Sequence, residues 1–500
     1  MGQLRLSRRQ AIEILAGLTA TLAWNPGSVA RAQTGPGRSS RREFNVRNFG
    51  AAGDGGTLDT AAVQRAIDAA ASVGGRVIVP GGRSYLVGTL ELKGGIDFHL
   101  ADDATLRAST RPEDYVGGAA VLAAVRETRN RVPGVEPNPE ERAATLLTAH
   151  EAHGLTLSGT GRIDGRFREF MAQYDQADEW WRPGPFRPNL AVLVGCRDLE
   201  VRDLTFQDAP IRTLHLVGCE QVLVDAVKVR NQLDVPNCDG IDPDHSRDVE
   251  IRNCDVVCGD DAIVVKASRA FASRGESSNI HVHDCVIETQ DSGLKVGTET
   301  AAAIHHVTFE RCTIRNSSRA LTIQLRDEAD VHDILFREIT FKSRYHSDPW
   351  WGRGEGISFT ALPRTAASRL GQIRDVRVEN VTGNAENSVR ISGCRESRIR
   401  GVIFDSVAVT LDRETEYRGG VWDNRPTASA YPPIEEHGTP GIAVRFADDI
   451  TLRRCRIDWG PHRPDYFTHA LEARDVARLS YPGFVGESAH PERESAVDVQ

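Results

Sequence analysis

The sequence predicts an all-β chain built as a parallel β-helix, a solenoid with a capping helix at its N-terminal end. Short segments that alternate apolar and polar residues recur from about residue 145 to about residue 457. Glycine is abundant, at 45 residues, and aromatic residues make up only 6% of the chain. Repeat periods of about 20 to 50 residues are typical of solenoids and arrays.

Equivalent apolar positions recur through the middle of the chain. The segments LEVRDLTF, VLVDAVKV, VEIRNCDVV, IHVHDCVI, VTFERCTI and ILFREITF place them at 201, 224, 251, 282, 309 and 336, with spacings of 23, 27, 31, 27 and 27 residues. Alternation with period two indicates strands, and the short bends between them contain Asn, Asp or Cys. No helical pattern lies between the strands, which argues against βαβ units and leucine-rich repeats, and a propeller needs longer, four-stranded units.

A capping helix is predicted close to the start of the folded part, near Phe44. A strand and a Gly-rich turn lead to Asp59 or Thr60, either of which suits a helix N-cap, and Ile67 lies on the apolar side that follows. The glycine pair at 74–75 ends the helix. Such a helix protects the open strand edges at the end of a solenoid from aggregation.

Residues 1–32 resemble a twin-arginine signal peptide. Arg8 and Arg9 precede a short apolar run, and Ala30-Arg31-Ala32 offers a small-x-small cleavage site. The alternative is an ordinary amphipathic N-terminus. We expect a signal peptide over 1–32, a linker over 33–42, one β-helix domain with loop insertions over 43–485 and a flexible tail over 486–500. The protein is then exported to the periplasm or the extracellular space, with no membrane span.

Charge and cysteine content narrow the choice of partners. A net charge of −9 and a pI near 6.0 argue against nucleic-acid binding, and a polyanion would need a local basic cleft. The nine cysteines are odd in number and form no CxxC pair. Buried thiols stacked from coil to coil are the favoured interpretation, with disulfides and metal binding as alternatives.

The stretch from 237 to 266, NCDGIDPDHSRDVEIRNCDVVCGDDAIVVK, concentrates acidic residues. Asp239 and Asp260 are 21 residues apart, which would place them at equivalent points of successive coils, and Asp261 lies beside them. Crowded carboxyl groups raise at least one pKa, so one group can act as an acid and another as a base, as an inverting glycosidase requires. A Ca²⁺ site or solvated turn acids are the alternatives.

The pattern NxDGID followed by GDDxIxxK resembles the polygalacturonase family, glycoside hydrolase family 28. The segment from Phe44 onward likewise resembles the entry segment of the pectin-lyase-like right-handed β-helix superfamily, and the resemblance covers roughly residues 44–460. It implies a right-handed β-helix with Asp260 as general acid and with Asp239 and Asp261 as the pair that holds and deprotonates the attacking water. Lys266 continues the second motif, and we expect a structural role for it.

Two further motifs of that family are altered here. Ser292 stands where the family's Gly-His-Gly has its histidine, and Thr322 and Gln324 replace the Arg and Lys of Gly-x-Arg-x-Lys, which grip the galacturonate carboxylate. Lys295 and Arg326 lie two residues beyond the altered positions and are candidate replacement cations, although core-covering or solvated roles are equally open. These departures shift the expected substrate towards rhamnogalacturonan or the end of a short oligomer.

Four insertions could build the walls of a binding groove. They span residues 111–143, 166–188, 343–370 and 411–440. Sugar rings stack on aromatic side chains, so a tryptophan pair in the third insertion suits a subsite wall. The candidate substrate-binding residues are Ser292, Lys295, Gln324, Arg326, Trp350, Trp351 and His215, with Arg319, Glu299, Glu355, Trp180 and Trp181 as weaker candidates.

The leading hypothesis is a secreted inverting glycoside hydrolase that cleaves pectic polysaccharide or its oligomers, acting from a chain end or on rhamnogalacturonan. A polysaccharide lyase on the same fold and a non-catalytic carbohydrate-binding β-helix are the alternatives. We expect a monomer without metal or cofactor.

Overall fold

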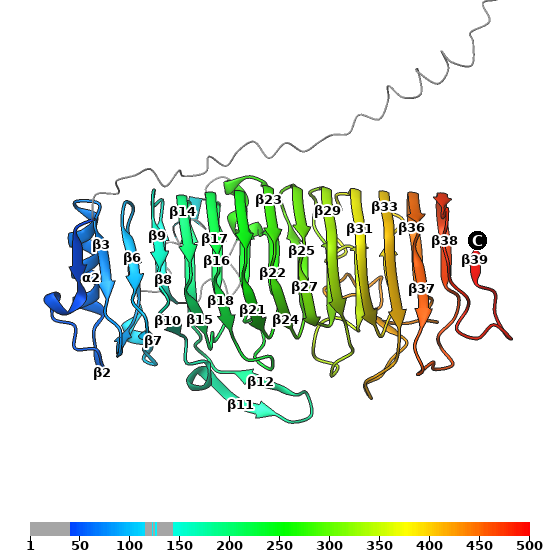
Figure 1. Cartoon of the computed structure of the whole chain (residues 1–500). Coiled ribbons are helices and arrows are strands. Elements are labelled where there is room, and N and C mark those ends of the chain that lie inside the picture. Colours follow the sequence, from blue (N-terminus) through cyan, green and yellow to red (C-terminus); the bar gives the residue numbers. More distant parts are fainter. Residues whose placement is uncertain (1–40, 116–122, 124–125, 128–143) are drawn as a thin grey trace, which may run out of the picture. The chain divides into compact units, whose positions relative to one another are not determined.

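The computed structural model describes residues 41–115, 123, 126–127 and 144–500. The predicted signal peptide, most of the linker and most of the first insertion therefore lie outside the described residues. The remainder folds as the predicted parallel β-helix, with strands of successive coils side by side in chain order (Figure 1).

Parallel pairing between successive coils builds three long sheets. The first sheet contains β1 (Glu43–Asn45), β3 (Arg76–Val79), β6 (Asp97–Leu100), β9 (Thr156–Ser158), β14 (Arg197–Arg202), β17 (Glu220–Asp225), β20 (Arg247–Arg252), β23 (Ser277–His283), β26 (Ile304–Glu310), β29 (Val331–Lys342), β31 (Ile373–Ala385), β33 (Ile399–Leu411), β36 (Ile442–Arg453) and β38 (Leu471–Ser480).

The second sheet contains β2 (Asp54–Leu58), β4 (Arg83–Val87), β7 (Ala104–Ala108), β10 (Arg162–Asp164), β15 (Thr205–Gln207), β18 (Lys228–Arg230), β21 (Asp255–Cys258), β24 (Val286–Thr289), β27 (Thr313–Asn316) and β37 (Arg456–Trp459), joined by the ends of β29, β31 and β33.

The third sheet contains β5 (Leu90–Leu92), β8 (Thr145–His150), β13 (Asn189–Val194), β16 (Leu214–Val217), β19 (Ile241–Asp244), β22 (Ile263–Ala267), β25 (Ser292–Thr300), β28 (Arg319–Leu325), β30 (Glu355–Ala361), β32 (Val389–Ser392) and β39 (Val497–Val499), joined by the first residues of β36 and β38.

The core consists of inward-facing residues stacked from coil to coil. Val224 aligns with Ile251, Ile251 with Val282, and Val282 with Phe309, and all four are fully buried. The equivalence predicted from the repeat spacing is therefore confirmed. The ring of Phe309 stacks on that of Phe336 in the next coil, with centroids 5.0 Å apart. This stacking extends one apolar column along the solenoid and removes it from water.

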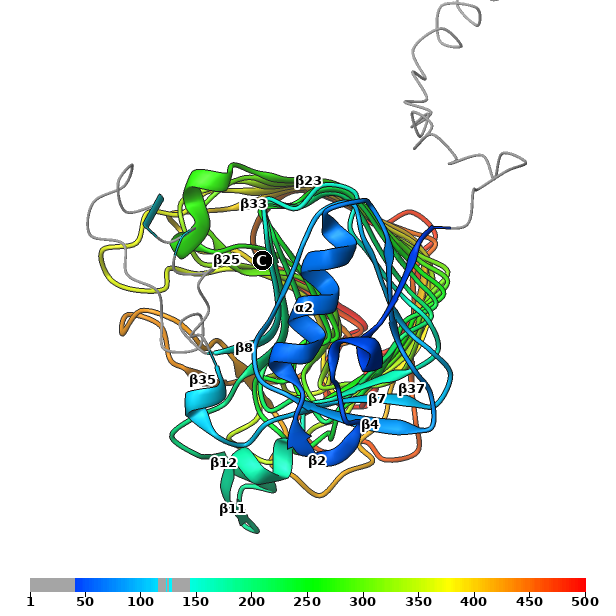
Figure 2. The ribbon, with the colours of Figure 1, turned by 90° about the vertical axis from the view of Figure 1, so that its left-hand side faces the viewer.

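Helix α2 spans Thr60–Ala71 and lies across the first coils at the N-terminal end of the β-helix (Figure 2). Its Val63 and Ile67 are fully buried. The Asp59 side chain makes no capping bond to the helix. Its carboxylate instead accepts the backbone N–H groups of Ala52 (2.6 Å) and Gly53 (3.0 Å), so it shapes the Gly-rich turn that leads into the helix.

The short helical turns are η1 (Val46–Phe49), η2 (Pro112–Asp114), η3 (Phe167–Phe170) and η4 (Arg269–Arg274). The insertion 166–188 carries η3 and an antiparallel hairpin of β11 (Met171–Asp175) and β12 (Trp180–Pro183), which projects from the solenoid (Figure 1). The insertion 411–440 carries a second hairpin, β34 (Val421–Asp423) with β35 (Ile434–Glu436).

Two segments differ from the prediction. The insertion 343–370 is not wholly loop, because β30 lies within it and pairs with β28 and β32. The tail 486–500 is not a free extension either, because β39 pairs with β38 and adds a strand to the third sheet. Polar residues dominate this tail, but an edge strand needs few apolar residues when backbone pairing holds it.

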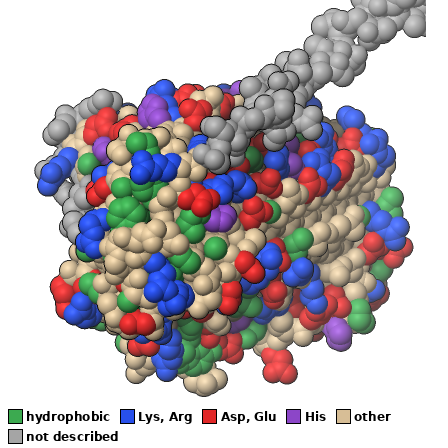
Figure 3. Space-filling view, turned by 60° about the vertical axis from the view of Figure 1, so that its left-hand side comes forward, with side chains coloured by type: hydrophobic (Ala, Val, Ile, Leu, Met, Phe, Trp, Pro, Cys, Tyr) green, Lys and Arg blue, Asp and Glu red, His purple; other side chains and the backbone are tan. Residues whose placement is uncertain are grey.

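All nine cysteines are free and buried. Cys285 lies against Cys254 and Cys312 of the neighbouring coils, so the predicted stack of buried thiols is confirmed. On the face seen in Figure 3, acidic and basic side chains are interspersed. None of the helices in the described part of the chain has the length and apolar character needed to cross a membrane.

Candidate active site

The acidic motif lies where the coils enter the third sheet. Ile241 in β19 aligns with Ile263 in β22, so the residues two positions earlier, Asp239 and Asp261, occupy equivalent points of successive coils. The predicted equivalence of Asp239 and Asp260 is therefore wrong by one residue. Coil length varies along this solenoid, so only the strand pairing decides which acids align. Ser292 of β25 continues the same column.

Three buried carboxyl groups meet at this point. One carboxylate oxygen from each of Asp239, Asp260 and Asp261 lies within 4.8 Å of the other two. They line a cavity of about 250 Å³. The other lining residues are Arg212, Asn237, Lys266, Asp291, Lys295, Thr298, Glu299, Arg319, Gln324, Trp351, Arg425 and Pro426.

Two buried lysines neutralise two of the three acids. Lys266 of β22 places its Nζ 2.7 Å from Oδ2 of Asp239. Lys295 of β25 donates to both carboxylate oxygens of Asp261, at 2.9 and 2.7 Å. Burying a charge is costly unless it is paired, so each lysine favours the ionised form of its partner.

Asp260 has no lysine partner among these contacts. Its oxygens accept the backbone N–H groups of Asn237 (3.0 Å) and Asp261 (2.9 Å), which fix the direction of the carboxyl group. Burial raises its pKa well above the usual range, and the negative charges of Asp239, Asp291 and Asp261 raise it further. Both effects favour the protonated form of Asp260.

The other two carboxyls each lie beside a lysine that lowers their pKa. Burial raises the pKa of Asp239, but Lys266 and Arg212 outweigh it and hold the pKa below the usual value. Burial raises the pKa of Asp261 to about 7, against the opposing charge of Lys295. The site thus combines one proton donor with two carboxylates that can accept a proton, which is the arrangement required for general acid–base catalysis.

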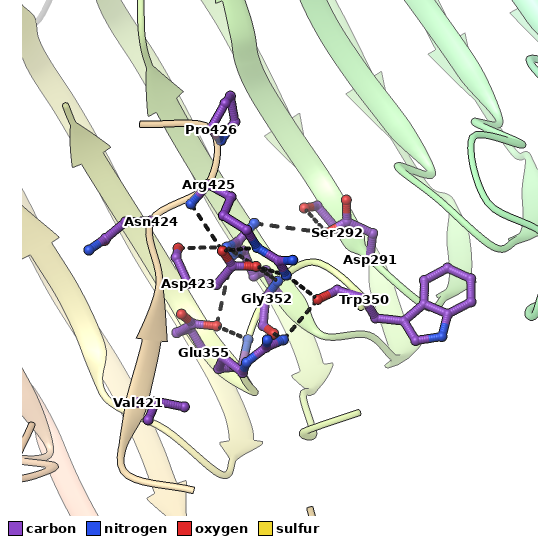
Figure 4. Close-up of polar contacts among 12 residues, drawn as sticks. Asp291, Ser292, Trp350, Gly352, Glu355, Val421, Asp423, Asn424, Arg425 and Pro426 are labelled. Atoms are coloured by element: carbon purple, nitrogen blue, oxygen red, sulfur yellow. Dashed lines mark hydrogen bonds and ion pairs between the residues drawn. The ribbon is translucent and has the colours of Figure 1, made fainter. Parts of the chain in front are cut away.

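Insertions from later coils form the wall opposite the acids. Trp351 and Arg425 lie together, with the Arg425 guanidinium 4.7 Å from the centre of the indole ring. Asp423 accepts hydrogen bonds from Arg425 Nε and Nη2, both at 2.9 Å (Figure 4). Arg319 of β28 donates to the backbone carbonyl of Asp423 at 3.0 Å, which ties the insertion to the third sheet.

Three of the predicted substrate-binding residues line the cavity: Lys295, Gln324 and Trp351. The Lys295 ammonium group forms an ion pair with Asp261, so it is not free to serve as the carboxylate-binding cation predicted from the sequence. Glu299 and Arg319, two of the weaker candidates, also line the cavity.

The other predicted binding residues lie outside the lining. Ser292 donates to Asp291 Oδ1 at 3.0 Å. Trp350 is fully buried, and its ring meets the edge of the Trp180 ring with centroids 5.6 Å apart. His215 is buried 3.0 Å from Asp244 Oδ2.

The contacts of Arg326 and Glu355 hold neighbouring parts of the protein together. Arg326 is buried and donates to the carbonyl oxygens of Pro426 (2.9 Å) and Thr360 (3.2 Å). Glu355 accepts the backbone N–H of Arg353 and lies 3.8 Å from Arg319. Arg326 supports the segment around Pro426, and neither residue contacts the three acids in the described structure.

Sequence reasoning missed two cavity cations, Arg212 and Arg425. Arg212 precedes β16 and lies 3.9 Å from Asp239 Oδ2, one coil before the acids. Its position could have been found by extending the coil register backwards. Arg425 lies in a long insertion that does not follow the repeat, so the coil register could not predict its position.

The three acids could also be considered as metal ligands, and in the described part of the chain they are the one group of three or more potential ligands. However, the ammonium groups of Lys266 and Lys295 already neutralise Asp239 and Asp261 at hydrogen-bonding distance. A divalent cation would have to displace them against charge repulsion, so the residues present do not fit a metal site.

Comparison with known proteins gives the family. A family model described as Glycosyl hydrolases family 28 matches residues 136–419, more than half of the chain. The chain belongs to this family. A probable polygalacturonase of Vitis vinifera is 26% identical over 388 residues, which cover 73% of each chain. The probable polygalacturonase At3g15720 of Arabidopsis thaliana is 25% identical over 295 residues, which cover 57% of this chain and 55% of that protein.

The fold is also that of solved family 28 structures. The exopolygalacturonase of Yersinia enterocolitica superposes with a TM-score of 0.66 over 88% of this chain and 78% of its own, at 18% sequence identity. This likeness confirms the right-handed parallel β-helix of the family 28 chain.

Proposed function

We propose that this family 28 protein is an inverting glycoside hydrolase that removes sugar from the end of galacturonate-containing pectic oligomers. The observation that carries the proposal is the convergence of Asp239, Asp260 and Asp261 within 4.8 Å in one cavity, with their pKa values driven apart. A hydrolase needs one protonated and one ionised group facing the same bond.

Each acid has a distinct role in this proposal. Asp260 protonates the departing glycosidic oxygen, because burial and neighbouring negative charge keep its proton in place. Asp239 and Asp261 hold a water molecule between them and remove its proton as it attacks the anomeric carbon. Their lysine partners favour the ionised form of both carboxylates, which for Asp261 predominates above its pKa of about 7.

Inversion is supported by the pairing of the carboxylates with lysines. A water bound between oxygens no more than 4.8 Å apart can hydrogen-bond to both, since an O–H···O bond spans about 2.7 Å. Inverting enzymes usually separate their carboxyl groups by about 6.5 to 9.5 Å, so spacing alone would favour a covalent intermediate. However, a carboxylate bound to an ammonium at 2.7 Å is a poor nucleophile, which favours attack by water.

End-directed cleavage is supported by the size of the cavity and by its wall. At about 250 Å³ it lies below the ~300–1,000 Å³ of typical ligand pockets, which suits a terminal sugar better than an extended chain. The insertion carrying Arg425 and Pro426 stands across from the acids as a fixed wall.

The test is a reducing-end assay on polygalacturonate, rhamnogalacturonan and their oligomers, with Asp260→Asn beside the wild type. We expect monomer release from galacturonate oligomers with little loss of polymer viscosity, and a loss of about 10²- to 10⁴-fold in the variant. NMR of the first product should show the anomer opposite to that of the substrate. Unsaturated product, or unchanged turnover in Asp260→Asn, contradicts the proposal.

Export is the remaining part of the proposal. The pair Arg8 and Arg9 ahead of an apolar run supports a twin-arginine route to the periplasm or beyond. Replacing both arginines by lysine should retain the protein inside the cell in a fractionation experiment. Unchanged export of that variant would contradict this route.

A further inference from the structure

Arginines line the cavity in addition to the two lysines that pair with the acids. Lys266 and Lys295 are each matched by one catalytic carboxylate. Four buried arginines lie around the insertion segment 421–426, and a fifth, which is partly exposed, belongs to the segment itself. These are Arg319, Arg326, Arg353, Arg390 and Arg425.

Backbone and side-chain contacts fix this segment in place. Arg390 donates to Asn424 Oδ1 at 2.8 Å and lies over the ring of Trp422 at 4.2 Å. Asn387 donates to the carbonyl of Val421 at 2.9 Å. Figure 4 shows the segment lying beside Glu355 and the backbone of Trp350. The cations at this wall are therefore held in a preformed arrangement.

Carboxylates lie within ion-pair distance of four of the five arginines. Arg319 lies near Asp291, Glu355 and Asp423, Arg353 near Asp348, and Arg390 near Glu435, while Arg425 is paired with Asp423. No carboxylate in the described part of the chain forms an ion pair with Arg326, whose contacts are all with carbonyl oxygens. Burial, with Arg319, Arg390 and Arg364 nearby, lowers its pKa to about 9. A buried cation in this state favours an anion at the adjoining surface.

Arg425 is the most exposed of the cations that line the cavity. Its side chain is 27% exposed, whereas the other four lining cations, Arg212, Lys266, Lys295 and Arg319, are 2 to 7% exposed. Asp423 holds its Nε and Nη2, and the carbonyl of Trp350 also accepts from Nη2 at 2.8 Å. None of the hydrogen bonds within the described residues uses its Nη1, and Trp351 supports the guanidinium plane.

We propose that Arg425, oriented by Asp423 and supported by Trp351, binds the carboxylate of a uronic acid and selects acidic over neutral sugars. This inference rests on the proposed function and names the charged group that the cavity recognises. Arg425 takes over a task that neither Thr322 nor Gln324 on the third sheet can perform, since neither carries charge.

The experiment measures binding rather than turnover. Galacturonic acid and galactose, which differ at the carboxylate, are titrated separately into the full chain and followed by NMR or calorimetry. We expect the wild type to prefer galacturonic acid, and Arg425→Gln to reduce that preference by about 10- to 100-fold, as expected for a lost hydrogen bond to a charged group. Arg425→Lys keeps the positive charge but loses the planar guanidinium with its paired N–H donors. This variant should retain part of the preference for galacturonic acid.

Arg418→Gln is the matched control, because Arg418 lies on the same insertion, is exposed and pairs with Glu436. It should leave the preference unchanged. Equal binding of both sugars by the wild type, or an undiminished preference in folded Arg425→Gln, overturns the inference. Because no turnover is needed, failure of the hydrolysis assay would refute the proposed function without deciding this test.

Discussion

Replacing Lys295 by methionine tests the acid–base assignment most directly. Lys295 Nζ lies 2.7 and 2.9 Å from the two oxygens of Asp261, and both side chains are buried. At an effective dielectric constant of about 20, Coulomb's law gives about 6 kcal/mol of attraction at this separation. Desolvation offsets part of it, and opposite charges this close typically lower a carboxyl pKa by about 1 to 3 units.

The direction of the effect follows from the role of Asp261. Its pKa is about 7, and the water-activating pair works only when ionised, so kcat/KM should fall as pH drops through about 7. Removing the ammonium raises the pKa of Asp261 further. The acidic limb of the profile therefore moves to higher pH by about 1 to 3 units, and kcat/KM at pH 6 falls by about 10- to 1,000-fold.

The assay is the pH dependence of kcat/KM on a galacturonate oligomer, with folding of each variant checked by circular dichroism. Lys342→Met is the matched control, because Lys342 forms an exposed ion pair with Glu414 at 2.6 Å. It should leave the profile in place and cost at most about 1 kcal/mol of stability. An acidic limb that stays at its wild-type position in folded Lys295→Met would refute the assignment of Asp261.

Three further predictions concern the acid, the metal question and the core. Asp291→Asn removes a negative charge that raises the pKa of Asp260, so the alkaline limb of kcat/KM should move to lower pH; a shift to higher pH contradicts this reading. Excess EDTA should leave the rate of hydrolysis unchanged, because lysines already neutralise the carboxylates. Activity that is lost on chelation and restored by Ca²⁺ would show that the protein needs a metal ion. Phe359→Ala should cost about 3 to 5 kcal/mol in urea denaturation, because its ring is fully buried and stacks on Phe336 at 5.8 Å; Phe359→Leu should cost less.

Much of the fold could be predicted because its signals are local. Alternation with period two needs only neighbouring residues, and it correctly aligned Val224, Ile251 and Val282 on consecutive coils. The two acidic motifs were recognisable for the same reason, since each is a contiguous stretch. The tail was the main error in the fold, because β39 is held by pairing with β38 and not by an apolar pattern of its own.

The site was only partly predictable. Sequence separation placed Asp239 beside Asp260, whereas strand pairing aligns it with Asp261, since coil length varies and register is decided between coils. The sequence also did not show in which direction the charged side chains point. Lys295 was a candidate for binding the substrate, but in the folded chain its ammonium group reaches one coil back to the Asp261 carboxylate.

The sequence by itself determined the solenoid, the three acids and the loss of the family's usual carboxylate-binding pair, because these are properties of single stretches. Only the tertiary structure decided which distant basic residues line the same cavity as the acids. Arg425 is 165 residues from Asp260 along the chain, yet both line one cavity. An insertion is placed by the contacts it makes after folding, here with buried arginines of earlier coils, and no periodic signal encodes such contacts in advance.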